Sequence, residues 1–114
     1  NNPYTMSTLG ILYGVMGETD KAREIIDEIK NIEGVETLEY NGSIAEVYLG
    51  IGDWDTAFMY FNKAVDNREG NMIWKRTVYK DLPSFMEDPR AIAMFEKMNI
   101  IYYCYAKNPV FEGI

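Results

Sequence analysis

The sequence predicts an all-α fold made of antiparallel helix pairs. Two observations predict it. Apolar residues recur at intervals of three and four positions, and one pattern of small, aromatic and glycine residues occurs twice, 35 positions apart. A chain of 114 residues, 47% of them hydrophobic, has enough apolar material for one core. We therefore expect a single helical domain.

The first helix is expected from Tyr4 to Met16, where apolar residues take helical spacing. Its inward-facing residues are predicted to be Met6, Leu9, Ile11, Leu12, Tyr13, Val15 and Met16. Gly10 and Gly14 would each cost about 1 kcal/mol in a helix relative to alanine. We interpret them as points where another backbone comes close. Gly17 is expected to end the helix, and residues 18–20 to supply acceptors for the next one.

The second helix is expected from Asp20 to Asn31. One stripe of it is aliphatic, formed by Ala22, Ile25, Ile26 and Ile29. The charged residues on its other faces are interpreted as a solvated surface. Residues 31–37, which contain Gly34, are expected to form the loop to the next helix.

The strongest signal is an internal repeat between residues 9–26 and 44–61. The pairs at an offset of 35 are Leu9 with Ile44, Gly10 with Ala45, Tyr13 with Tyr48, Gly17 with Gly52, Ala22 with Ala57, and Ile26 with Phe61. No insertion separates them. The small residues would let two helices approach closely, and the glycine would permit a tight reversal. Because each helix pair leaves one apolar face uncovered, the pairs are expected to stack.

These residues resemble the tetratricopeptide repeat (TPR) family. The positions that fit its whole pattern are Ala45, Tyr48, Gly52, Ala57, Phe61 and Ala64. The earlier copy also fits, except that its last position holds Ile29, which is larger than the alanine of the pattern. The spacing is one residue longer than the usual repeat of about 34 residues. The resemblance implies a short right-handed α-solenoid, with repeat 1 at about 4–32 and repeat 2 at about 38–67.

A C-terminal helical cap is expected at about 72–98. Residues 72–79 are expected to form a short helix, and residues 82–86 an apolar cluster. Asp88 and Pro89 are an N-cap and a first helical residue for a helix from Arg90 to Met98, closed by Asn99. Its predicted buried residues are Ile92, Ala93, Met94, Phe95 and Met98. The apolar tail, 99–114, either packs on its own chain or docks on a neighbouring copy.

The region from the second repeat onward is also similar to the C-terminal repeat regions of bacterial multidomain signalling proteins. The matching residues are Gly52, Asp53, Ala57, Phe58, Ala64, Trp74, Phe85, Asp88, Pro89, Arg90, Lys97 and Met98. The resemblance implies the regulatory C-terminal part of a signalling or transcription-related protein. The chain opens without a methionine, and we expect it to be a fragment of a longer protein.

Composition argues against several classes of function. The net charge of −7 and the pI near 4.5 disfavour nucleic acid and anionic lipid as partners. The sequence has no histidine and one cysteine, Cys104, which argues against Ser-His and Cys-His nucleophiles and cysteine-based zinc sites. There is no apolar run long enough to span a membrane and no signal peptide. We expect a cytoplasmic protein with no cofactor, metal or catalytic residue.

The resemblance places a peptide groove along the first helix of each pair. The residues that it implies are Tyr4, Ser7, Ile11 and Val15 in repeat 1, and Glu39, Gly42, Ser43, Glu46 and Leu49 in repeat 2. The chaperone-binding members of the family hold a peptide carboxylate there with basic residues and asparagines. This chain has glutamates and no basic residue at those places, so an acidic C-terminal peptide is not expected.

Three classes of function were weighed. The first is a protein-interaction module or scaffold that binds a protein or peptide. The second is a structural or homo-oligomerisation domain that uses the apolar tail. The third is an acid-base enzyme using Asp53 and Asp55, but those carboxylates are better explained as helix-start residues. We expect an interaction module and no enzyme activity.

Overall fold

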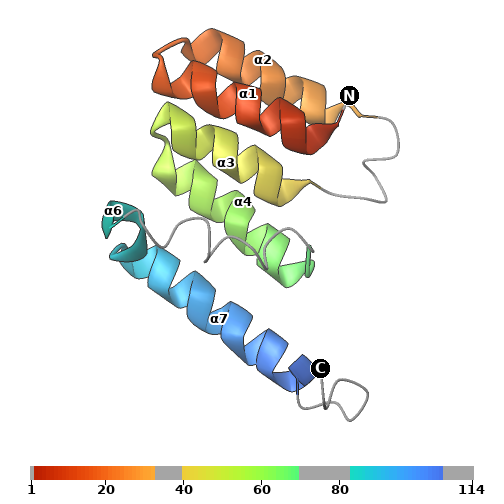
Figure 1. The fold of residues 1–114 in the computed structure, drawn as a ribbon, viewed down its shortest axis with the longest axis vertical. Helices are drawn as coiled ribbons and strands as arrows, with labels where there is room; N and C mark the ends of the chain where they lie inside the picture. The colour runs from red at the N-terminus through yellow and green to blue at the C-terminus, as the bar shows by residue number, and fades with distance from the viewer. Residues whose placement is uncertain (1, 33–39, 70–82, 107–114) are drawn as a thin grey trace. The chain divides into compact units, whose positions relative to one another are not determined.

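The computed structural model describes residues 2–32, 40–69 and 83–106, with side chains for all of these except 83 and 99–106. Every regular element in the described part of the chain is an α-helix, which confirms the all-α prediction (Figure 1). The chain divides into two units, Asn1–Gly70 and Asn71–Ile114, which are treated separately below. The C-terminal cap, in which residues of the second unit would cover the apolar face of the second helix pair, stays a prediction.

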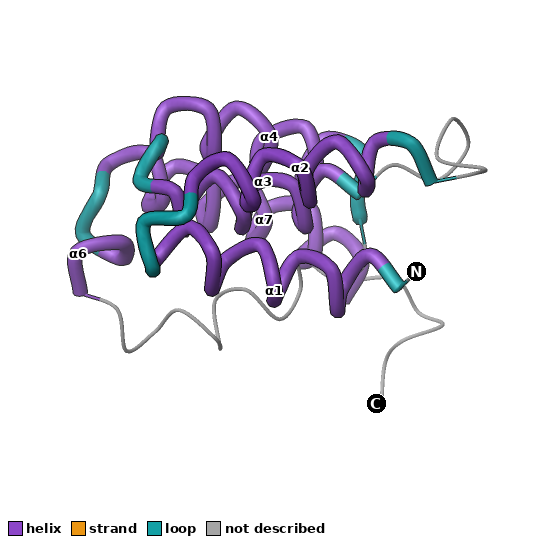
Figure 2. The backbone as a smooth tube through the Cα atoms, turned by 90° about the horizontal axis from the view of Figure 1, so that it is seen from above, coloured by secondary structure: helices purple, strands orange, loops and turns teal. Residues whose placement is uncertain are grey.

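The first unit contains two helical hairpins. Their helices are α1 (Pro3–Val15), α2 (Thr19–Lys30), α3 (Asn41–Ile51) and α4 (Trp54–Asp66). Helices α1 and α2 are antiparallel and pack together, as do α3 and α4 (Figure 1). Helix α3 also packs on both helices of the first hairpin, and α1 and α3 run in the same direction (Figures 1 and 2). The helix bounds lie close to those expected from the sequence.

Both hairpins turn by the same hydrogen bond. The two bonds are Glu18 N to the Tyr13 carbonyl, 2.8 Å, and Asp53 N to the Tyr48 carbonyl, 3.1 Å. The glycine inside each bonded turn is left-handed, with φ of +82° at Gly17 and +96° at Gly52. Only glycine adopts this conformation without steric cost, and the bond satisfies a carbonyl that the helix end leaves free. The repeated tyrosine and glycine therefore form one helix-ending motif.

The two turns begin their second helices differently. The Asp53 carboxylate accepts hydrogen bonds from Thr56 N at 3.2 Å and from Thr56 Oγ1 at 2.8 Å, so it caps α4. Glu18 occupies the matching position before α2, but its side chain makes no capping bond. Its carboxylate pairs instead with Lys21 Nζ at 3.4 Å.

Helices α1 and α3 meet backbone to backbone at glycines. A Cβ atom added at Gly14 would lie 2.6 Å from the Gly50 carbonyl carbon, and one added at Gly50 would lie 2.9 Å from Ile11 Cα. A Cβ atom on Gly10 would lie 2.8 Å from Val47 Cγ2. These distances are too short for a real Cβ contact. The predicted close approach of another backbone is confirmed at Gly14, where the partner is α3. The atoms nearest to Gly10 belong instead to the side chains of Val47 and Ile25.

The core of the first unit lies between the hairpins. Its buried members are Ala22, Ile25, Ile26 and Ile29 of α2 with Ile44 and Val47 of α3. The repeat positions Ala45, Ala57, Phe61 and Ala64 are fully buried as well. Tyr48 stacks on Tyr60 with ring centroids 5.6 Å apart. The aliphatic stripe predicted for the second helix therefore faces inward.

On α1 the predicted inward face is only partly correct. Met6 and Tyr13 pack against the core, but four of the residues predicted to face inward are exposed: Leu9, Leu12, Val15 and Met16. The stripe that is buried consists of Pro3, Ser7, Gly10 and Gly14. The helix is apolar around most of its circumference, so hydrophobic periodicity could not choose its inner face.

A carboxylate links the end of α4 to the start of α3. Arg68 is left-handed, with φ of +54°, and this turn carries the chain to Glu69. Glu69 accepts three hydrogen bonds: from Asn41 N at 3.3 Å, Asn41 Nδ2 at 3.0 Å and Gly42 N at 3.0 Å. A negative charge at a helix N-terminus is favourable, and the bonds satisfy backbone donors that the helix leaves free. Glu69 thereby connects the C-terminal end of α4 to the N-terminal end of α3, the two ends of the hairpin opposite its turn.

The second unit contains α6 (Pro83–Met86) and α7 (Pro89–Ala106). Asp88 Oδ1 accepts a hydrogen bond from Arg90 N at 2.8 Å, and its carboxylate also pairs with the Arg90 guanidinium at 3.1 Å. The predicted start of this helix, with a capping Asp88 and Pro89 as its first residue, is confirmed. The predicted helix at 72–79 lies outside the described residues.

One prediction about α7 was wrong, and the predicted buried set was correct only for Met94, Phe95 and Met98. The helix does not end at Asn99 but continues to Ala106, because no glycine or proline interrupts residues 99–106. The first eight residues of the predicted tail are therefore helical. The buried residues are Ala91, Met94, Phe95 and Met98, whereas Ile92 and Ala93 are exposed. The buried set has helical spacing, and the prediction had given weight to hydrophobicity rather than to spacing.

The contact between the glycines can be tested with Gly14→Ala. The added methyl group would meet backbone atoms of α3 that cannot rotate away, so α1 and α3 must separate. We expect a loss of about 1–3 kcal/mol in the free energy of unfolding, measured by urea denaturation, despite the better helix propensity of alanine. The control is Thr8→Ala on the exposed side of α1, which should change stability by about 0.5 kcal/mol or less. Equal effects of the two substitutions would contradict the backbone contact.

The Glu69 contact can be tested with Glu69→Gln. Glutamine has one acceptor oxygen and no charge, so at least one of the three donors loses its bond. We expect a loss of about 1–3 kcal/mol in stability and faster amide hydrogen exchange at Asn41 and Gly42. Glu28→Gln on the exposed side of α2 removes the same charge and serves as the control. Unchanged exchange at the start of α3 would show that the carboxylate does not hold those amides.

The start of α7 should depend on pH through Asp88. Its hydrogen bond from the Arg90 side chain lowers the pKa of the Asp88 carboxyl below its ordinary value of 3.8. Because the folded pKa is lowered, this contribution to stability is complete above 3.8 and is lost as the pH falls through the folded pKa. We expect an NMR titration to place the Asp88 midpoint below 3.8, and Arg90→Gln to move it upward. A midpoint that Arg90→Gln leaves unchanged would contradict this cause.

Candidate functional site

The predicted groove residues divide between the surface and the interior. Tyr4 and Val15 are exposed on α1, and Ile11 between them is half-buried. Glu46 and Leu49 of α3 are also half-buried. Because α1 and α3 lie side by side and run in the same direction, these residues belong to neighbouring helices that can form one surface (Figures 1 and 2). We call Tyr4, Ile11, Val15, Glu46 and Leu49 the first-helix surface.

Ser7, Gly42 and Ser43 do not belong to this surface, because all three are buried. Ser7 lies on the stripe of α1 that includes Gly10 and Gly14, where α1 meets α3. Its hydroxyl donates a hydrogen bond to the Tyr4 carbonyl at 2.8 Å. These three positions of the predicted groove are therefore buried in this structure. Glu39 lies outside the described residues.

The first turn of α3 is enclosed on several sides. Its five buried residues follow one another in the sequence, from Asn41 to Ala45. Among the described residues, the Ser43 hydroxyl is a buried side-chain group without a hydrogen-bond partner. Asn41 and Gly42 at the start of the turn bind the Glu69 carboxylate. Sequence periodicity could not reveal this contact, because Glu69 follows Asn41 by 28 positions.

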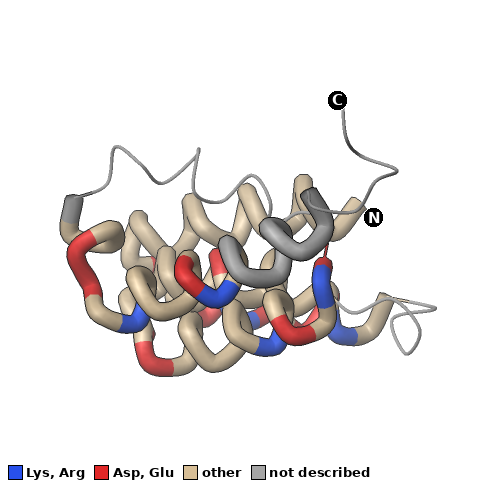
Figure 3. The backbone as a smooth tube through the Cα atoms, turned by 90° about the horizontal axis from the view of Figure 1, so that it is seen from below, with Lys and Arg blue, Asp and Glu red and all other residues tan. Residues whose placement is uncertain are grey.

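The first-helix surface is nearly free of charge. No charged residue occurs in α1, and α3 contains Glu46 alone. Figure 3 shows the positions of the acidic and basic residues, none of which belongs to α1. At its N-terminal end the Tyr4 ring meets the Tyr40 ring edge-on, with centroids 6.2 Å apart. Such a surface offers aromatic and aliphatic contacts with one carboxylate, which suits a neutral or basic ligand.

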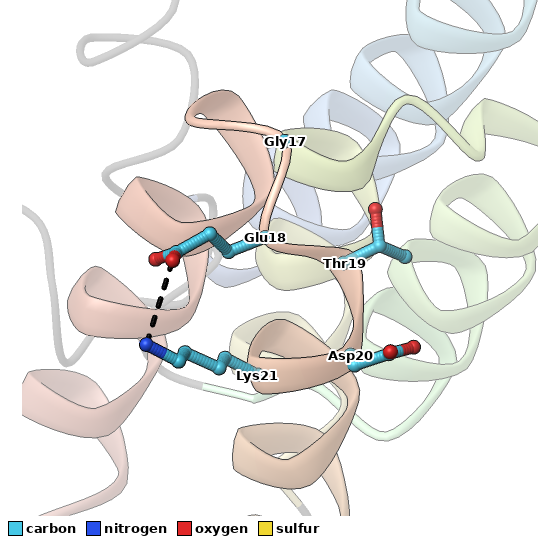
Figure 4. Close-up of a pocket in the computed structure, with 5 residues that line it drawn as sticks. All are labelled: Gly17, Glu18, Thr19, Asp20 and Lys21. Carbon is cyan, nitrogen blue, oxygen red and sulfur yellow. Dashed lines mark hydrogen bonds and ion pairs between the residues drawn. The ribbon is translucent and has the colours of Figure 1, made fainter.

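A second candidate is a hollow of about 300 Å³ at the α1–α2 turn. Its lining residues are Gly17, Glu18, Thr19, Asp20 and Lys21 (Figure 4). The Glu18 carboxylate and the Lys21 ammonium pair with each other across it, and Lys21 Nζ also lies 5.5 Å from the centre of the Tyr13 ring. The opposite charges of Glu18 and Lys21 therefore already neutralise each other. The hollow is lined by five consecutive residues of the turn.

A third candidate is a group of lysines around Tyr60. The Nζ atoms of Lys30 and Lys63 lie 5.5 Å and 5.1 Å from the centre of its ring. A side-chain hydrogen bond with Tyr60 raises the pKa of Lys30 above its ordinary value of 10.5. The group connects α2 with α4. Cation–π contacts of this kind stabilise exposed helices by about 0.5–1 kcal/mol.

Neither a metal site nor a membrane-spanning helix is found among the described residues. They contain no cluster of three or more cysteine, histidine, aspartate or glutamate side chains that could hold a metal ion. None of the helices in these residues combines the length and the hydropathy needed to cross a bilayer. No protein-family model, curated protein or solved structure matches the chain significantly. The candidate site therefore depends on the geometry of α1 and α3.

Proposed function

We propose that this chain is a protein-interaction module of the tetratricopeptide type that binds an extended peptide along α1 and α3. In this proposal the two hairpins are repeats of a short right-handed solenoid, and the second unit is its cap. The observation that carries it is that both hairpin turns are closed by the same backbone hydrogen bond, donated by Glu18 N in one turn and by Asp53 N, 35 positions later, in the other. Equivalent turns favour equivalent hairpins, and stacked hairpins present their first helices on one side.

The first-helix surface supports a ligand of particular chemistry. Exposed Tyr4 and Val15 can cover aliphatic or aromatic side chains of a peptide, and Glu46 can pair with a basic one. There is no lysine or arginine in α1 or α3 to hold a carboxylate. The proposed ligand is therefore a neutral or basic segment of another protein, and not an acidic C-terminal peptide.

The proposal includes no catalytic role. The Asp53 carboxylate binds the backbone and the hydroxyl of Thr56, which accounts for its position at the start of α4. By its resemblance to the C-terminal repeat regions of bacterial signalling proteins, the module would serve as the regulatory part of a signalling or transcription-related protein in the cytoplasm. Its partner would then be another protein of that pathway or another domain of the same protein.

Selection of ligands from a phage library of random linear peptides tests the proposal. We expect the selected peptides to be neutral or basic, and Val15→Glu to weaken their binding about 10-fold or more in fluorescence polarisation. Glu46→Lys should shift the preference toward acidic peptides. The matched control is Met59→Glu, which places the same charge on an exposed apolar residue of α4.

Two results would count against the assignment. In the first, no peptide is selected by the folded chain. In the second, selected peptides bind Val15→Glu and Glu46→Lys as well as they bind the unmodified protein, and the site lies elsewhere. Circular dichroism of each variant shows whether α1 and α3 remain helical.

A further inference from the structure

Helix α1 has a second exposed side, which the proposed peptide surface does not use. Leu9 and Leu12 lie there at helical spacing with Met16, the C-cap residue of the helix, and the three are 43%, 54% and 70% exposed. We call these three residues the outer stripe. Helix α1 contains no charged residue, and the exposed polar residues within it are two threonines, Thr5 and Thr8. Three large apolar side chains in contact with water on such a helix indicate a packing surface.

The internal repeat shows what covers such a stripe. At an offset of 35, the outer stripe corresponds to Ile44, Val47 and Ile51 of α3. Ile44 is 4% exposed and Val47 is fully buried, and Ile51 packs beside them. The residues that cover them include the aliphatic stripe of α2: Ala22, Ile25, Ile26 and Ile29. The same positions are thus buried in the second repeat by the helix pair that precedes it.

We propose that the outer stripe of α1 is a stacking surface for a further helix pair, whose second helix carries an aliphatic stripe spaced like that of α2. The contact is apolar on both sides, as it is between α2 and α3. A second copy of this chain does not supply such a pair, because the apolar stripes of both of its second helices, α2 and α4, are already buried. The occupant is therefore a helix pair with a free aliphatic face, packed on α1 as α1 and α2 pack on α3.

One position limits how the further pair can fit. Val15 corresponds to Gly50, where a Cβ atom would lie 2.9 Å from both Cα and the carbonyl oxygen of Ile11. The branched side chain of Val15 prevents an incoming first helix from approaching α1 as closely as α1 approaches α3. The further pair must therefore stand farther from α1 on that side, and a direct copy of α1 and α2 fits well only if Val15 is replaced by glycine.

A duplication within the full chain tests the proposal. A copy of residues 3–37 is inserted directly before Pro3, which keeps the spacing of 35 between successive first helices. We expect the duplicated chain with Val15→Gly in its original α1 to show one unfolding transition, with a midpoint on the order of 5 °C above that of unduplicated Val15→Gly. In the duplicated chain that keeps Val15, the unfolding midpoint should rise by less than this above that of the unduplicated chain with Val15.

Two substitutions decide whether the gain comes from the outer stripe. Leu12→Glu in the original α1 should abolish the rise in the unfolding midpoint that duplication produces. Met59→Glu on α4 should leave this rise unchanged. Leu12 is more than half exposed, so Leu12→Glu in the unduplicated chain should shift the midpoint by about 2 °C or less, which shows that the variant still folds.

The proposal is overturned if the duplicated chain shows a separate transition for the added pair, or if Leu12→Glu leaves the gain intact. Light scattering of the unduplicated chain gives an independent result. A dimer that Leu12→Glu dissociates would assign the outer stripe to a second copy and would also overturn the proposal. These results depend on Leu12 and on Val15, and Val15 also belongs to the first-helix surface. Peptide binding is therefore judged separately, by Glu46→Lys in the unduplicated chain.

Discussion

The first unit depends on the contact between the backbones of α1 and α3 at Gly14 and Gly50. Atoms that side chains normally keep apart come so close there that neither position has room for a Cβ atom. This contact fixes the distance between the two hairpins, and the distance decides which side chains fill the space beside it. Val47 and Ile25 then close around Gly10, and α2 packs its aliphatic stripe on α3. At Gly10 and Gly14, two residues of the buried stripe of α1, this distance leaves no room for a side chain.

The same contact determines which sides of α1 remain for function. With its small residues turned to α3 and Tyr13 packed against the core, α1 leaves two exposed sides. One carries Tyr4 and Val15, and the other carries Leu9, Leu12 and Met16. Neither side has a charged residue, whereas the chain as a whole carries a net charge of −7. Specificity on α1 must therefore come from shape and apolar contact, with Glu46 on α3 as the nearby charge of the first-helix surface.

The candidate site could be predicted only in part. The residues that repeat with a period of 35 located the first helices correctly, and Tyr4 and Val15 are exposed there. Ser7 was assigned to the groove by its place in the repeat, but it lies on the small stripe buried between α1 and α3. The contact of Glu69 with the start of α3 was not predicted at all. It joins residues 28 positions apart through a left-handed turn at Arg68, which no periodic pattern signals.

The sequence by itself determined the helices, the two glycine turns and the caps at Asp53 and Asp88. Each of these depends on hydrogen bonds between residues at most five positions apart, so short-range pattern is sufficient to specify them. Only the tertiary structure decided the inner face of α1, the buried face of α7 and the role of Glu69. Helix α1 is apolar on nearly all sides, and the face that it buries is chosen by the fit of its glycines to α3, which lies far along the chain.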